Sequence, residues 1–305
     1  MTLQRSTPRR RGDRRRPSTP LAVVALVVCA LVVAFLLIRS ENGDLGGAAR
    51  DDRPNASAAS AGPNGSGSAS GAGGPGGASQ SAAGADLVDR LIESGAVAGA
   101  LAADRGTASG GRHAPPTPLP ASVVDAARAA LATVPVRPSG SGSYDRAADF
   151  GDGWQDPDGN GCDARNDELA AAMTRISLAG DGCRVLSGTL DDPYTGRRID
   201  FVRGPGTSDV VQIDHVVALA NAWRTGASSL SAERRTDLAN DPLNLQATDG
   251  PTNQGKSAKD ASQWLPPSAA YRCTYVARQI AVKAVYGLWV TSAERDAMTA
   301  VLSAC

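Results

Sequence analysis

Aromatic residues and cysteines divide this 305-residue chain near Leu119. All four tryptophans, all five tyrosines and four of the five cysteines lie after that point. These are the side chains that bury large apolar areas or cross-link a small core. Residues 119–305 number about 190, enough for one domain with its own core. We therefore expect a single folded domain in this part of the chain.

A basic segment followed by an apolar run precedes that domain. Residues 1–20 are rich in arginine, and residues 21–38 are uninterruptedly apolar up to Arg39. At about 1.5 Å per residue, this run just spans a bilayer core of roughly 30 Å. The basic flank predicts a cytoplasmic tail, a transmembrane signal anchor in the cell membrane and an extracytoplasmic domain. A cleaved signal peptide is the alternative, and cleavage would leave the domain secreted.

Residues 39–118 have the composition of a linker. Gly, Ser, Ala, Pro and Asn dominate them, so they cannot bury enough apolar surface to offset the entropy lost on ordering. A short apolar pattern over residues 86–101 is flanked by Gly and Ala, which argue against a stable helix. We expect a disordered linker and assign no chemistry to His113 within it.

The cysteines of the predicted domain form an even set in an oxidising compartment. Sequence alone permits three pairings. We predict Cys162–Cys183 and Cys273–Cys305, each closing a loop of moderate length and adding about 3–4 kcal/mol in the loop-entropy model. A zinc site is the alternative, but the cysteines include no Cys-x-x-Cys pair and the domain has one histidine.

Hydrophobic spacing and turn residues predict an α+β domain without internal repeats. The predicted helices cover residues 120–133, 167–178, 252–265, 270–286 and 292–302. The predicted strands cover residues 185–190, 198–203, 210–217 and 243–248. We interpret all four tryptophans as core residues.

His215 is the only histidine in the predicted domain, and it lies in a strand-like run beside Asp214. Only histidine titrates near neutral pH without perturbation, which makes His215 the candidate general base for a hydrolysis. Asp214 and Asn253 supply oxygen donors suited to Mg²⁺ or Mn²⁺. Lys256, one helical turn after Asn253, is a candidate phosphate contact. Asn244 is expected to fix the imidazole tautomer. A half-buried structural histidine and a turn-forming Asn244 are the alternatives.

These segments resemble the HNH endonucleases. The likeness lies in Asp214-His215, Asn244-Leu245 and Asn253-x-x-Lys256. A wider likeness joins residues 144–305 to secreted or anchored bacterial HNH proteins, which are similar to the C-terminal HNH domain of GmrSD-type restriction enzymes. The segments that carry it are Asp156-Pro157-Asp158-Gly159-Asn160-Gly161-Cys162-Asp163-Ala164-Arg165-Asn166, Asp192-Pro193-Tyr194-Thr195-Gly196, Gln212-Ile213-Asp214-His215-Val216-Val217-Ala218-Leu219 and Trp264-Leu265-Pro266-Pro267.

The resemblance implies a ββα-metal core embedded in a disulfide-stabilised helical domain. It implies metal-dependent cleavage of DNA, with Asp214 and Asn253 at the metal, His215 as base and Asn244 positioning it. The family often has His where this chain has Asn253, a change that disfavours zinc more than catalysis. The resemblance also suggests Arg165 at the active site. The arginine that binds phosphate is not identified, and the candidates are Arg165, Arg197, Arg198 and Arg272.

A second metal hypothesis comes from an acidic loop. Asp156, Asp158 and Asn160 copy the opening of a calcium-binding loop, with Asp167 at its twelfth position. Cys162 and Arg165 inside the loop depart from the EF-hand pattern. The alternative to a structural Ca²⁺ site is a disulfide-tethered turn of Asp and Gly.

Together these patterns predict an extracytoplasmic nuclease acting on DNA or RNA. The chain as a whole has no net charge, which weighs against tight electrostatic binding of nucleic acid. Two alternatives follow: a catalytically inert binding module on an HNH scaffold, and a cell-surface domain stabilised by Ca²⁺. No protein partner can be inferred from the sequence.

Overall fold

The computed structural model describes residues 75–97 and 118–305, and each structural statement below concerns those residues. The predicted tail and anchor, residues 1–38, lie outside them. No helix in this described part is long and apolar enough to cross a bilayer. The elements are α2 (Pro75–Glu93), α4 (Ala121–Thr133), α5 (Arg146–Phe150), α6 (Ala164–Ala172), β1 (Met173–Leu178), β2 (Val185–Asp191), β3 (Arg198–Val202), β4 (Val211–His215), α7 (Leu219–Arg224), α8 (Ala232–Asn240), β5 (Leu245–Asp249), α9 (Gly250–Lys256), α10 (Arg272–Val285) and α11 (Ser292–Ser303).

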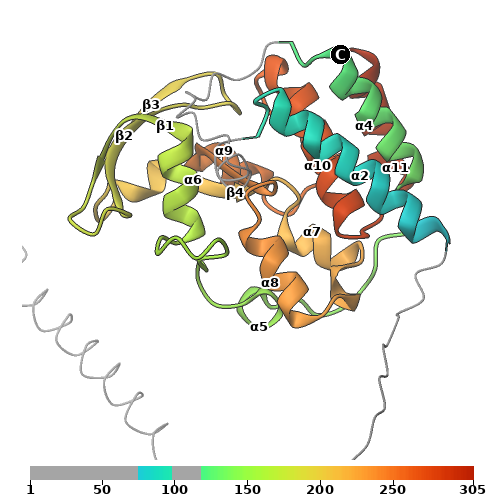
Figure 1. Cartoon of the computed structure of the whole chain (residues 1–305), viewed down its shortest axis with the longest axis horizontal. Coiled ribbons are helices and arrows are strands. Elements are labelled where there is room, and N and C mark those ends of the chain that lie inside the picture. The colour runs from blue at the N-terminus through green and yellow to red at the C-terminus, as the bar shows by residue number, and fades with distance from the viewer. Residues whose placement is uncertain (1–74, 98–117) are drawn as a thin grey trace, which may run out of the picture. The chain divides into compact units, whose positions relative to one another are not determined.

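Two hydrophobic cores fill the domain. The larger one is helical and centres on α10, against which α2, α4 and α11 pack. The smaller one lies between α6, the sheet β1–β2–β3 and the strand pair β4–β5. In Figure 1, β4 and α9 lie between the three-stranded sheet and the helical bundle. The strand pair therefore lies where the two cores meet, and this α+β arrangement agrees with the predicted class.

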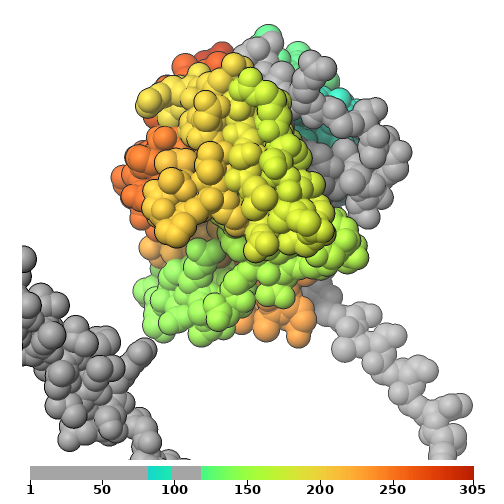
Figure 2. Space-filling model, turned by 90° about the vertical axis from the view of Figure 1, so that its left-hand side faces the viewer, coloured from blue at the N-terminus to red at the C-terminus, as the bar shows by residue number. Residues whose placement is uncertain are grey.

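The three-stranded sheet is antiparallel throughout, in the order β1–β2–β3. Residues 167–178 were expected to form one helix, but the helix ends at Ala172 and β1 begins at Met173. The alternation of Ile176, Ser177 and Leu178 has the period of a strand, and pairing with β2 satisfies its backbone. Figure 2 faces the side of the domain that carries this sheet.

Helix α2 corrects the linker prediction over residues 75–97. Leu87 and Leu91 are fully buried in the helical core. Gly84 lies where α2 crosses α10, because a Cβ atom there would come within 2.8 Å of the Cβ of Ala284. The small residues that lower the helix propensity of this segment thus allow close packing, and packing provides most helix stability in proteins.

Both predicted disulfides are confirmed. Cys162–Cys183 joins the start of α6 to the start of β2, with the two Cα atoms 5.2 Å apart. Cys273–Cys305 joins α10 to the residue that follows α11, with its Cα atoms 6.0 Å apart. Each core thus has one covalent cross-link.

Leu91→Ala tests whether α2 belongs to the domain. Deleting a fully buried leucine side chain is expected to lower the free energy of unfolding by about 2–5 kcal/mol. Glu93→Ala, an exposed site on the same helix, is the control and should change it by less than about 0.5 kcal/mol. Chemical denaturation measures both free energies of unfolding. Equal stability of the two variants would mean that α2 is not part of the folded domain.

Candidate functional site

Strands β4 and β5 pair antiparallel, and α9 follows β5 directly. Asp214 lies opposite Gln246, and His215 lies opposite Leu245. The side chain of Asp249 caps α9 by accepting a hydrogen bond from the backbone nitrogen of Thr252 at 2.9 Å. This cap turns the chain sharply from strand to helix, so α9 lies against the strand that carries Asp214.

A buried ion pair joins α9 to β4. The Nζ atom of Lys256 donates to Oδ1 of Asp214 and to the backbone oxygen of His215, both at 2.8 Å. The hydroxyl of Tyr194 donates to Oδ2 of Asp214 at 2.6 Å. Burial raises the pKa of Asp214, and Lys256 opposes that shift by favouring the carboxylate. The charge of Lys256 therefore offsets the desolvation of Asp214, and α9 keeps one position along β4.

His215 is held as a neutral imidazole. Its Nε2 lies 2.9 Å from the carbonyl oxygen of Ala239, which can only accept, so Nε2 carries the proton and Nδ1 is the basic nitrogen. Burial lowers the pKa of His215 to about 3. The ring stacks on Trp154, with centroids 5.7 Å apart. Trp154, interpreted from sequence as core, is partly buried against the smaller core and also stacks on this histidine.

A pocket of about 270 Å³ contains the three residues at the centre of the sequence prediction: Asp214, His215 and Asn253. Arg146, from the start of α5, also lines it. The guanidinium carbon of Arg146 lies 6.0 Å from the ring centroid of Trp154, on which His215 stacks. Sequence reasoning missed this arginine, because it lies at the start of the short helix α5, far from His215 in the chain, and no motif marks it.

Oxygen atoms in this pocket suit a hard cation. Asn253 donates its Nδ2 to Oε1 of Gln212 at 3.0 Å, which turns its own amide oxygen to the other side. Each carboxylate oxygen of Asp214 has a second acceptor site besides the one in use. Two protein oxygens fit Mg²⁺, which keeps several waters. In the described chain, no cluster of three or more His, Cys, Asp or Glu is placed to hold a metal.

Asn244 braces the backbone rather than the imidazole, which corrects its predicted role. Its Oδ1 accepts from the backbone nitrogen of Val217 at 2.8 Å, and its Nδ2 donates to the carbonyl of Leu238 at 3.2 Å. Its own carbonyl accepts from the nitrogen of Val216 at 2.8 Å. These bonds connect the residues after His215 to the last turn of α8, from which Ala239 fixes the imidazole tautomer.

Lys256 and Arg165 do not lie where a phosphate contact requires. Lys256 is fully buried against Asp214, so its predicted phosphate role is wrong. Arg165 does not line the pocket, and its guanidinium approaches the backbone oxygen of Val211 at 3.5 Å. The other sequence candidates, Arg197, Arg198 and Arg272, do not line the pocket either. Arg146 is the arginine that does line the pocket.

The acidic loop forms a hydrogen-bonded turn. Asp156 accepts from the backbone nitrogens of Asn160 and Gly161 at 3.1 and 2.9 Å. The side chain of Asn160 donates to Asp158 at 3.0 Å and approaches Asp167 at 3.4 Å. The oxygens that the calcium hypothesis requires are thus engaged with amide groups of the loop. This geometry is that of the disulfide-tethered turn.

Comparison with known proteins gives one family match and one relative. Residues 163–301 match the family described as GmrSD restriction endonucleases, C-terminal domain. An uncharacterized secreted protein of Arthroderma benhamiae (strain ATCC MYA-4681 / CBS 112371) is 37% identical over 195 residues, which cover 62% of this chain and 91% of the relative. No solved structure matches the chain significantly.

The low pKa of His215 makes folding sensitive to acid. The unfolded chain binds a proton near pH 6.5 and the folded chain only near pH 3, so stability is full above pH 6.5 and falls as the pH drops between these values. At pH 5 this histidine should lower the free energy of unfolding by about 2 kcal/mol relative to its value above pH 6.5. In His215→Gln the amide can still donate to Ala239 but does not titrate.

Denaturant unfolding at pH 7.5 and pH 5 in EDTA compares the two chains. Between pH 7.5 and pH 5, the free energy of unfolding should fall by about 2 kcal/mol more for wild type than for His215→Gln. Equal losses would mean that the imidazole is not buried in its neutral form.

Proposed function

The chain belongs to the family of the C-terminal domain of GmrSD restriction endonucleases, and from this premise we propose that it is a metal-dependent nuclease. The observation that carries the proposal is the pocket in which the neutral His215, Asp214, Asn253 and Arg146 meet. We assign β4, β5 and α9 as the ββα-metal core of an HNH endonuclease. The substrate class is nucleic acid, with DNA expected first and RNA as the alternative.

His215 acts as the general base in this proposal. With Nε2 donating to Ala239, the lone pair of Nδ1 is free to take the proton of an attacking water. Burial disfavours the imidazolium in the empty pocket, whereas the negative charge of a bound phosphate favours it. The ring therefore becomes more basic when substrate is present, and the stack on Trp154 keeps it oriented.

Asp214 and Asn253 hold the divalent cation, for which Mg²⁺ or Mn²⁺ is expected. Such a cation, when bound, supplies positive charge for the phosphate and for the leaving oxygen. Lys256 and Tyr194 position the carboxylate of Asp214 and stabilise its ionised form. Arg146 binds the phosphate, because its guanidinium is the charged donor on the wall beside His215.

We propose that the domain works outside the cytoplasm. Two disulfides favour an oxidising compartment, and the relative from Arthroderma benhamiae is described as secreted. The transmembrane anchor predicted for residues 21–38 is part of this proposal. A membrane anchor would keep the nuclease at the cell surface.

One observation favours a binding module as the second candidate. Lys256 already neutralises Asp214, which lowers the affinity of that carboxylate for a cation. A module of this kind would bind nucleic acid without cleaving it, and EDTA would not change its affinity. Cleavage that depends on a divalent cation separates the two functions.

The chain has two histidines, which provide a matched pair for testing the base. The purified chain should nick and degrade plasmid DNA with Mg²⁺ or Mn²⁺ but not in EDTA. His215→Ala should lower the rate by about 10²–10⁴-fold, the usual contribution of a general base. His113→Ala should cleave like wild type. If His215→Ala is folded by circular dichroism and retains full activity, the assigned base is wrong.

Arg146→Gln tests the phosphate contact. Loss of a charged hydrogen bond worth about 1.5–3 kcal/mol should lower kcat/KM by roughly 10–100-fold. The control is Arg198→Gln, since Arg198 is exposed and pairs with Asp191 away from the pocket. Steady-state cleavage of a labelled oligonucleotide measures kcat/KM for both variants. An unchanged kcat/KM for Arg146→Gln would mean that Arg146 does not bind the phosphate.

A further inference from the structure

A second, larger pocket of about 610 Å³ adjoins the His215 pocket. The two share Ser257 and Ala258, which follow α9 and form a common wall. Ser257 has a φ of 52°, a left-handed conformation that is unfavourable for a serine. The sharp turn there ends α9 and leaves space on both sides of the wall.

Cations dominate the charge of the second pocket. Arg224 and Lys259 line it, together with Asp260. Arg224 donates to the carbonyl of Ala258 at 3.1 Å, and the exposed Lys259 caps the end of α9 through the carbonyl of Gly255 at 2.8 Å. Asp260 is largely buried and its Oδ1 accepts two hydrogen bonds from Ser262. The pocket therefore offers two positive charges to a ligand against one carboxylate that is already hydrogen-bonded.

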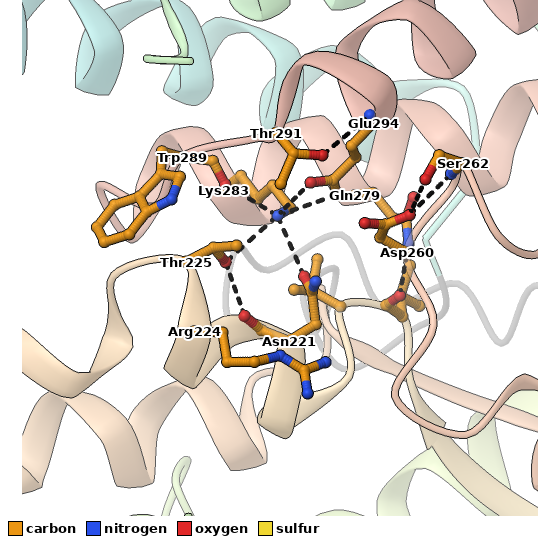
Figure 3. A network of polar contacts seen from close by, with 12 residues as sticks. Asn221, Arg224, Thr225, Asp260, Ser262, Gln279, Lys283, Trp289, Thr291 and Glu294 are labelled. Carbon is orange, nitrogen blue, oxygen red and sulfur yellow. Dashed lines mark hydrogen bonds and ion pairs between the residues drawn. The ribbon is translucent and has the colours of Figure 1, made fainter. Parts of the chain in front are cut away.

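A buried lysine behind the pocket is linked to two of the residues that line it. Lys283 is fully buried and donates to Oδ1 of Asn221 at 3.2 Å and to the carbonyl of Trp289 at 3.0 Å (Figure 3). It also forms an ion pair with Glu294 at 3.0 Å, and the nitrogen of Glu294 donates to Oγ1 of Thr291 at 3.1 Å. Asn221, in α7, and Thr291, the N-cap residue of α11, both line the pocket, so the network holds these two lining residues in place before any ligand binds.

We propose that this second pocket holds the nucleic acid strand on one side of the phosphate that is cleaved. Arg224 and Lys259 bind the neighbouring backbone phosphates, and serine, asparagine and threonine side chains supply further polar contacts. The residues that line it include no aromatic side chain on which a base could stack, so the contact is to the backbone and independent of sequence. This inference rests on the proposed nuclease function.

Lys259→Gln tests the inference by binding rather than by cleavage. Its exposed side chain can change without cost to the core. Arg184→Gln is the control, because Arg184 is an exposed cation before β2 that lines neither pocket. Fluorescence anisotropy with a labelled 12-nucleotide single strand in EDTA measures Kd from 50 to 300 mM salt. Lys259→Gln should weaken binding by several-fold for every sequence and reduce the salt slope by about 0.7, the contribution of one phosphate contact.

The outcomes distinguish this inference from the proposed function. If wild type cleaves DNA but Lys259→Gln and Arg184→Gln have the same Kd and salt slope, the second pocket is not the strand site and the nuclease stands. If Lys259→Gln alone weakens binding and no metal supports cleavage by wild type, the second pocket binds nucleic acid but the nuclease is wrong. Absence of binding by wild type would overturn the strand site, and the metal-dependent cleavage assay would decide the nuclease separately.

Discussion

The ion pair between Lys256 and Asp214 is the interaction on which the candidate site depends. It joins the end of α9 to β4, and Lys256 also binds the carbonyl of His215. Asn253 lies three residues before Lys256, so the same contact sets where its amide lies relative to the imidazole. Removing one partner of such a pair would leave an uncompensated buried charge, which costs about 3–5 kcal/mol. The position of α9 is therefore strongly determined.

Other buried cations hold backbone segments near the two pockets in place. Arg278 is almost fully buried and donates to the carbonyls of Leu243 and Leu245, which lead into β5. Lys283 likewise binds Asn221, which lines the second pocket, and pairs with Glu294. Each cation binds several oxygens from different segments, so one charge orders several stretches of chain. These positively charged side chains do not line the His215 pocket themselves.

The sequence predicted those site residues that short local motifs mark. Asp214, His215 and Asn253 lie in short motifs, and all three reach one pocket. Their spacing along two predicted strands and a helix was enough to predict that they share one site. Arg146 is different, because only the fold brings the start of α5 to the pocket, with its guanidinium over the Trp154 ring. The burial of Lys256 could not be predicted either, since the sequence shows its charge but not that Asp214 is its partner. Helix α2 was missed because its stability comes from packing on α10 rather than from its own residues.

Manganese broadening of histidine NMR signals tests the central claim most directly. With two histidines in the chain, a sample labelled with ¹⁵N-histidine gives one set of ring signals for His215 and one for His113. A neutral imidazole beside a cation held by Asp214 and Asn253 predicts an Nε2-protonated tautomer at pH 7. It also predicts that substoichiometric Mn²⁺ broadens the His215 signals and leaves those of His113 sharp. A protonated ring, or equal broadening of both histidines, would contradict the account.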